Sequence, residues 1–478
     1  MEPISTLTFH WHNSYMQQPN PKSSPKSAET IYSDSILVEG STDAGHDAKQ
    51  KVEETLNDNA CHTTIPSAPH EKSMPTGSTT DIVPEGGLRA WLVVLGGACC
   101  HFATYGYGGT WGVFQAYYQH TFLEEMSPSA ISWIGSIQHA TAVIPYLILG
   151  HFFDKGYFHS TFIAASVLLV VATMLVAECT SYWQFMLCQG IITGLCVGII
   201  CTPVSPIITQ WFREKRALAL SLSALGTALG GTMFPIVARQ LLPLVGFQWT
   251  IRVMGVIISI TLLLGNLTIR RRLPPAEDTP SPLITFAPLK HRAFLAYCSA
   301  SICLYFGIRA FTTYVASAAV SKGIPEDFAF YLVSITNGIS GVGKISAGFL
   351  SLRTGILNYM IATLIATTIV IIGWPTAATQ PALIAIAVLF GFTSGGYSAL
   401  TYPPVIELGD PKHLFGRLGL LSLSIAIGGL SGPPIAGEIH KIAGLQVMGF
   451  YAGGWILLGV GLLLFMTYSL LGKVWGKV

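Results

Sequence analysis

Residues 158–178 of the chain read FHSTFIAASVLLVVATMLVAE, an apolar run with one acidic residue at its very end. A bilayer has a hydrocarbon core about 30 Å thick, which about 20 apolar helical residues can cross. This run is therefore long enough for one crossing, and similar runs separated by short polar breaks fill the chain beyond Trp91. The sequence predicts twelve crossings, at 90–118, 129–150, 158–178, 182–209, 216–238, 247–269, 293–319, 328–350, 356–376, 381–405, 415–438 and 446–471.

The composition agrees with a membrane protein. Of the 478 residues, 51% are hydrophobic and only 10% are charged, whereas soluble domains carry about 25% charged residues. A net charge of +2, with no basic run among aromatic residues, excludes nucleic acid as a partner. The nine cysteines show no metal-ligand spacing, and no cofactor or metal is expected.

Residues 1–84 are rich in Ser, Thr, Pro, Asn, Asp and His and poor in large apolar residues. Such a segment buries too little surface to offset the entropy of ordering, so a disordered tail is expected. It has no basic region followed by an apolar core, so no cleavable signal peptide is predicted.

Basic residues mark the orientation of the helices. The short loops and C-terminus on the side of the N-terminal tail hold fourteen Lys and Arg residues, and the opposite loops hold four. Cytosolic loops carry the excess of Lys and Arg. Both termini are therefore predicted to be cytosolic, with Arg270, Arg271 and Arg272 in the middle loop acting as a topology anchor.

Three short patterns recur in the same order at nearly one offset. The first pattern, Gly150-His-Phe-Phe-Asp154-Lys155-Gly156, recurs in similar form at 348–355. The second, Arg216-Ala-Leu-Ala-Leu-Ser-Leu-Ser, recurs at 417–424. The third is a proline that follows two glycines, Pro235 in the first copy and Pro433 in the second. This order predicts a duplication of six helices in parallel halves, with the substrate near the midplane between them. The expected domains are a tail (1–84), a first half (85–270), a cytosolic middle loop (271–292) and a second half (293–478).

The Gly-x-x-x-Asp-Lys loop after the second crossing resembles the signature of the major facilitator superfamily. Within that superfamily the chain is similar to the fungal branch of the monocarboxylate porter family. The further motifs that carry this resemblance are Glu85-Gly-Gly-Leu-Arg-Ala-Trp91, Trp211-Phe-Arg-Glu-Lys-Arg-Ala-Leu-Ala219, Gly416-Arg-Leu-Gly419 and Ser431-Gly-Pro-Pro-Ile-Ala-Gly437. The resemblance implies an all-α protein of twelve transmembrane helices with the major facilitator fold.

Two departures bear on the substrate. Lactate carriers of that family have a lysine deep in the first helix, where this chain has Gly109. They also have an Asp and an Arg one turn apart in the eighth helix, where this chain has Ser340 and Lys344. Both departures argue against proton-coupled lactate transport.

Two strong bases fall inside predicted crossings, Arg309 in the outer half of the membrane and Lys344 in the inner half. Charges in the hydrocarbon region are costly and usually functional. Tyr305 lies one turn from Arg309, and Asn337 shares a helix face with Ser340 and Lys344. These residues (Arg309, Tyr305, Asn337 and Lys344) are the candidate substrate-binding set. Each base also has a structural alternative. Arg309 could extend its charged end to the outer surface, and Lys344 could be satisfied by carbonyls and water at the inner mouth.

No carboxylate is predicted at mid-membrane, so histidines are the candidates for proton coupling. His101 and His139 both fall near the midplane, and histidine titrates near neutral pH. The alternative for each is a neutral ring satisfied by a neighbouring hydroxyl or carbonyl.

Two further features are structural. Asp154 and Lys155 are expected to latch the cytosolic gate, with a simple topology charge as the alternative. Gly190, Gly194 and Gly198 form a small-residue face in the fourth crossing, and close packing within the half is expected there.

The sequence thus predicts a secondary active transporter, not an enzyme, for a small organic anion or acid-bearing metabolite, working as a monomer in the bilayer with or without protons. It imports a carboxylate or exports a metabolite, and a non-transporting nutrient sensor on the same fold is the alternative. The cell membrane is the expected location, with the vacuolar membrane as the alternative.

Overall fold

The structure is a computed structural model that describes residues 85–274, 285–409, 413–473 and 476. All regular secondary structure in this described part is helical. The predicted tail and residues 275–284 of the predicted middle loop lie outside the described residues. The exact domain boundaries expected from the sequence stay predictions.

The first half contains α1 (Leu88–His101), η1 (Phe102–Gly106), α2 (Trp111–Thr121), α3 (Pro128–Thr141), α4 (Ile144–Asp154), α5 (Phe158–Val176), α6 (Tyr182–Phe185), η2 (Met186–Ile192), α7 (Thr193–Cys201), α8 (Val204–Thr209) and α9 (Arg216–Thr268). After η3 (Ala287–Lys290), the second half contains α10 (Arg292–Ser321), α11 (Glu326–Thr354), α12 (Ile356–Gly373), η4 (Trp374–Thr376), α13 (Gln380–Ala399), α14 (Pro403–Glu407) and α15 (Leu414–Leu471).

These helices form twelve crossings. Eight helical stretches of the described residues are long and apolar enough to cross a membrane. Two of them, α9 and α15, each contain two crossings joined at a glycine with positive φ, Gly246 (77°) and Gly444 (84°). Glycine alone adopts this conformation without a steric penalty. The α3–α4 pair and α11 supply the remaining two crossings.

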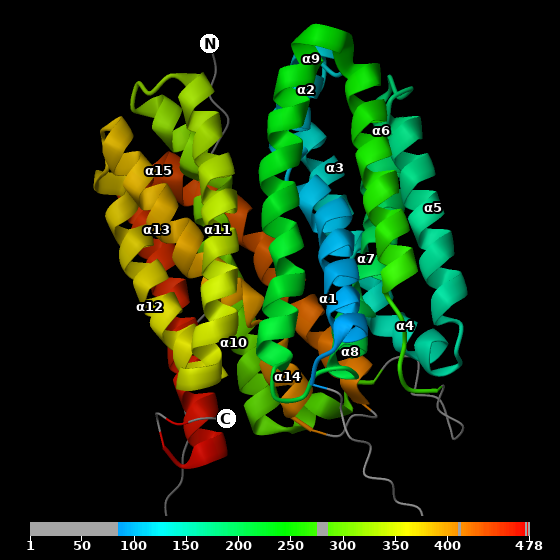
Figure 1. The fold of residues 1–478 in the computed structure, drawn as a ribbon. Helices are drawn as coiled ribbons and strands as arrows, with labels where there is room; N and C mark the ends of the chain where they lie inside the picture. Colours follow the sequence, from blue (N-terminus) through cyan, green and yellow to red (C-terminus); the bar gives the residue numbers. More distant parts are fainter. Residues whose placement is uncertain (1–84, 275–284, 410–412, 474–475, 477–478) are drawn as a thin grey trace, which may run out of the picture. The chain divides into compact units, whose positions relative to one another are not determined.

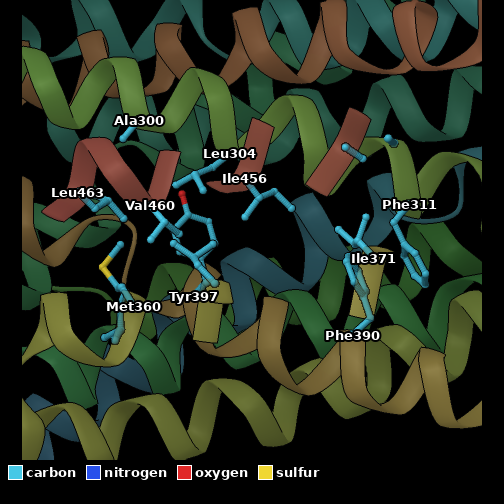
Figure 2. Packing of buried hydrophobic residues seen from close by; sticks show 14 of the residues in the cluster. Ala300, Leu304, Phe311, Met360, Ile371, Phe390, Tyr397, Ile456, Val460 and Leu463 are labelled. Atoms are coloured by element: carbon cyan, nitrogen blue, oxygen red, sulfur yellow. The ribbon is translucent and has the colours of Figure 1, made fainter. Parts of the chain in front are cut away.

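Two hydrophobic cores hold the bundle together. The first packs residues of the first half, including Phe114, Tyr118, Phe185 and Phe247. The second is built mainly from α10, α11, α12, α13 and α15, and Figure 2 labels ten of its residues. Within it the rings of Phe311 and Phe390 stack with their centroids 3.9 Å apart. The two halves therefore have largely separate cores.

Glycines let the helices within each half approach closely. A methyl group added at Gly226 or Gly230 of α9 would overlap or crowd the backbone of α1 and η1. In the second half, methyl groups at Gly428 and Gly432 of α15 would crowd the backbone of α10. The predicted duplication is therefore visible as the same helix contact in both halves.

The small-residue face in the fourth crossing is also confirmed as a packing surface. A methyl group at Gly194 would overlap Thr141 and the carbonyl of Gln138, and one at Gly198 would overlap the carbonyl of Ala142. The face therefore packs against α3 and the turn that follows it, within the first half.

The halves meet along two helix pairs. The pair α9 and α11 lies side by side along much of its length (Figure 1), and α4 meets the first part of α15. We call the end at which α1 begins and α15 finishes the proximal end, and the opposite end the distal end. At the distal end the Arg239 guanidinium of α9 lies 5.3 Å from the ring centroids of both Phe330 and Tyr331 of α11.

A carboxylate at the proximal end secures the start of α9. Glu85 accepts hydrogen bonds from the backbone N–H groups of Arg213, Glu214 and Lys215, at 2.6, 2.7 and 3.2 Å. Burial would raise the pKa of Glu85, but the three N–H donors outweigh it and hold the pKa below its usual 4.5. The contact joins the start of the first crossing to the start of the fifth.

We predict that Gly226→Ala lowers the stability of the purified protein by about 1–3 kcal/mol, because the added methyl overlaps the backbone of α1. Thermal unfolding in detergent measures the effect. The control is Gly461→Ala in α15, where nothing lies within 4 Å of the new methyl. Equal unfolding temperatures for the two variants would contradict the packing argument.

We predict that Glu85→Gln lowers stability by about 1 kcal/mol at neutral pH, as expected for loss of a charged helix cap. Because the pKa of Glu85 is lowered in the fold, its contribution is present above pH 4.5 and is lost as the pH falls below that value. Unfolding temperatures of the variant and the wild type should converge in acid. Glu125→Gln, an exposed acid at the distal end, is the control, and it should match the wild type throughout.

Candidate substrate-binding site and gates

Arg309 lies on α10 between the two halves and is half-buried. A methyl group at Gly429 of α15 would lie 3.8 Å from Arg309 Nε, which places the guanidinium beside α15. Tyr305, one turn earlier on α10, is in electrostatic range of Arg309. Among the described residues Arg309 has no ion-pair partner. The guanidinium is therefore a cation without a counter-ion in this part of the protein.

His139 brings the first half to the same place. It lies on α3, its Nδ1 is 2.9 Å from the carbonyl oxygen of Gly135, and its side chain is exposed. It is also within electrostatic range of Arg309. Two residues predicted independently, one as a proton carrier and one as an anion receptor, therefore lie within electrostatic range of each other.

Lys344 and His101 form a second pair. Lys344 is 6% exposed, and its Nζ donates to Ser340 Oγ at 3.3 Å. His101 lies within electrostatic range of Lys344. The His101 ring is also satisfied locally, because its Nδ1 lies 3.1 Å from the Ser223 carbonyl oxygen and 3.2 Å from Ser223 Oγ. The alternative expected such a ring satisfied by a neighbouring carbonyl or hydroxyl, and a role of His101 in proton coupling stays a prediction.

Asn337 makes a contact between the halves. Its Nδ2 donates to the carbonyl oxygen of Gly231 on α9 at 3.0 Å. A methyl group at Gly231 would lie only 3.4 Å from the Asn337 amide, so the glycine allows the bond. In this conformation the Asn337 amide nitrogen is engaged by the protein, and a role in substrate binding stays a prediction.

Three tyrosines near Tyr305 were missed by the sequence reasoning: Tyr105, Tyr146 and Tyr402. Tyr105 Oη lies 3.3 Å from Tyr146 Oη, and both residues are within electrostatic range of Tyr402. Tyr305 is also within electrostatic range of Tyr105 and Tyr402. A signal was available, because Tyr105 and Tyr305 lie 200 positions apart, close to the offset of the repeat.

The proximal end holds the halves together through the segment that was predicted to latch the gate. A methyl group at Gly150 would lie 2.5 Å from Phe415 Cβ, and the ring centroids of Phe153 and Phe415 are 4.8 Å apart. Asp154 lies in electrostatic range of Arg271, while Lys155 is exposed. Neither residue adjoins the Arg309 or Lys344 pair, as expected for gating residues, and their gating role stays a prediction.

The three arginines of the predicted topology anchor contact the proximal loops. Arg271 Nη1 donates to the Phe153 carbonyl at 2.6 Å, and its guanidinium carbon lies 4.4 Å from the centroid of the Phe153 ring. Arg270 Nη1 lies 2.6 Å from His159 Nε2, and the Arg272 backbone N–H donates to Gln210 Oε1 at 2.9 Å. These contacts fix the end of the first half against its own loops.

Two further arginines occupy matching places in the repeat. Arg216 at the start of α9 approaches Glu407 of α14 at 3.9 Å, which is an ion pair between the halves. Arg417 near the start of α15 donates through Nε to the Val405 carbonyl at 3.0 Å, within the second half. The two arginines therefore occupy equivalent positions of the repeat, and the contacts described for them are with different residues.

Comparison with known proteins places this architecture in a family. The model of the Major Facilitator Superfamily matches residues 93–406. The MFS transporter asaE of Aspergillus flavus is 34% identical over 79% of this chain and 86% of its own length. The Aspyridones efflux protein apdF of Emericella nidulans is 33% identical over 81% of this chain and 79% of its own length.

The fold matches a solved structure as well. The human organic anion transporter MFSD10 (TETRAN) superposes with a TM-score of 0.62 at 14% identity, covering 78% of this chain and 99% of that chain. Both the relatives and the fold are those of transporters and not of enzymes. The chain belongs to the Major Facilitator Superfamily and is one of its membrane transporters.

Proposed function

We propose that this transporter exports an acid-bearing metabolite by alternating access, with Arg309 receiving the anionic group. The observation that carries the proposal is the half-buried Arg309 guanidinium, which has no ion-pair partner among the described residues. Removing such a cation from water is costly unless an anion compensates it. A guanidinium also offers planar paired donors that match a carboxylate.

The direction of transport is inferred from a relative. The Emericella nidulans protein is named an efflux protein for aspyridones, and it covers most of this chain at 33% identity. Export is therefore the direction we propose, in place of uptake of a monocarboxylate. Lactate carriers have a lysine where this chain has Gly109, and an Asp–Arg pair where it has Ser340 and Lys344. Both departures support the same choice.

In the proposed cycle the proximal end is cytosolic, as the distribution of basic residues predicts, and the protein acts in the cell membrane. The substrate enters when the contacts of Gly150 with Phe415 and of Arg216 with Glu407 open. Asp154 and Lys155 then help to latch the closed proximal end. Tyr305, Asn337 and Lys344 contribute the polar lining on the second half.

The two histidines are proposed to link transport to protons. His139 is the stronger candidate, because it is exposed and within electrostatic range of Arg309. A proton on its ring would add a second positive charge beside the bound anion. His101 is the weaker candidate, because Ser223 already satisfies its Nδ1.

We predict that Arg309→Gln raises the apparent KM for organic acids at least about 10-fold, since a charge-assisted hydrogen bond contributes about 1.5–3 kcal/mol. Uncharged analogues of the same acids should be affected much less. The measurement is flux in proteoliposomes containing the purified protein. Arg252→Gln, which removes a distal ion pair with Glu178, is the control. Equal effects of Arg309→Gln on acids and uncharged analogues would assign Arg309 a structural role.

We predict that His139→Gln flattens the pH dependence of flux between about pH 5 and 8, because glutamine keeps a polar side chain but does not titrate. Flux should be followed across that range in proteoliposomes with a fixed membrane potential. His101→Gln should have the smaller effect. Wild-type pH dependence in both variants would remove the histidines from the coupling mechanism.

We predict that yeast expressing the chain at the cell surface releases a preloaded labelled organic acid faster than control cells. Expression of Arg309→Gln at the same surface level should remove the difference for the acid. Acid uptake in place of release would reverse the proposed direction. A folded surface protein with no flux of any tested solute in either direction would favour the nutrient sensor.

A further inference from the structure

Four tyrosines form a cluster between the halves, which we call the tyrosine cluster: Tyr105, Tyr146, Tyr305 and Tyr402. Tyr105 and Tyr146 come from η1 and α4 of the first half, and Tyr305 from α10 of the second. Tyr402 immediately precedes α14. The shortest contact, 3.3 Å, joins the hydroxyls of Tyr105 and Tyr146.

The cluster is polar where packing alone would favour phenylalanine. A buried phenol needs a hydrogen-bond partner, whereas a phenyl ring does not. The chain uses Phe311 and Phe390 for such packing in its second core. It also contains a tyrosine with a structural partner, Tyr297, whose hydroxyl donates to the Thr401 carbonyl at 2.6 Å.

Tyr305 differs from Tyr297 in its burial, because its side chain is half-buried whereas Tyr297 is buried. Tyr105 and Tyr402 are half-buried as well, while Tyr146 is 5% exposed. The cluster therefore gathers phenol hydroxyls, each able to donate and to accept, on side chains that are only partly buried by the protein.

Arg309 lies close to the cluster along the chain. Tyr305 precedes it by four residues on α10, which is one turn toward the proximal end, so the two side chains share a helix face. An acid could therefore hold its carboxylate at Arg309 and place a second oxygen among the tyrosine hydroxyls.

We propose that the tyrosine cluster is the specificity-determining part of the site, and that it selects acids that carry a hydroxyl or enol oxygen in addition to the carboxylate. The inference rests on the proposed function, because it takes Arg309 as the anion receptor. A site built to hydrogen-bond a hydroxyl discriminates strongly against the analogue that lacks it, since its own polar groups are then left unpaired.

The test compares the binding of 4-hydroxybenzoate and benzoate to the full chain in lipid nanodiscs, measured by titration calorimetry. The wild type should prefer 4-hydroxybenzoate by about 10-fold or more, since loss of one or two hydrogen bonds costs about 1–3 kcal/mol. Tyr105→Phe and Tyr402→Phe should each reduce this preference several-fold and leave benzoate binding nearly unchanged.

The matched control is Tyr107→Phe. Tyr107 lies two positions from Tyr105 but is 2% exposed and belongs to the first core, with no hydrogen-bond partner for its hydroxyl among the described residues. This variant should keep the wild-type preference. Thermal unfolding of every variant verifies that the fold is retained.

The outcomes separate the inference from the proposed function. In one outcome Arg309→Gln abolishes benzoate binding, but no cluster variant changes the preference for 4-hydroxybenzoate. That result overturns the role of the tyrosine cluster and leaves the proposed anion site intact. Absence of any Arg309-dependent binding of either acid overturns both. A wild type that binds the two acids equally also overturns the role of the cluster.

Discussion

Lipid offers a peptide group no hydrogen-bond partner, and the rest of this structure depends on that constraint. Each segment in the hydrocarbon region must satisfy its own backbone, and a helix does so within one segment. Because lipid is as apolar as the side chains it touches, helices associate through close packing and not through hydrophobic burial. Glycines such as Gly194, Gly226 and Gly428 permit that packing, since a methyl group at each would meet neighbouring backbone.

The same constraint makes the polar groups between the halves informative. Each half has a largely separate hydrophobic core. Polar side chains also lie where the halves meet, including Asn337, which donates to the Gly231 carbonyl of the other half. Contacts of this kind can be exchanged for water or substrate at small cost, whereas a packed core cannot be rearranged so easily. The meeting surface is therefore where a transporter can both move and bind.

Charge is distributed unequally along that surface. At the proximal end Arg216 has Glu407, and Glu85 has three backbone donors. Deeper in the bundle Arg309 and Lys344 have no carboxylate partner among the described residues, and each is within electrostatic range of a histidine of the other half. The proposed gate and anion site rest on this difference between the proximal end and the middle of the bundle.

Apolar length and recurring motifs are local properties of the chain, so the sequence was enough to predict the twelve crossings, the duplication and the superfamily. The resemblance to the monocarboxylate porter branch stays a prediction. The sequence also located Arg309 and Lys344, since a charge inside an apolar run is visible without coordinates. Only the tertiary structure decided the partners: His139 for Arg309, the Ser223 carbonyl and hydroxyl for His101, and the tyrosine cluster. The physical reason is that helical periodicity fixes the depth and face of a residue, whereas the partner across the halves depends on how two separately folded units pack.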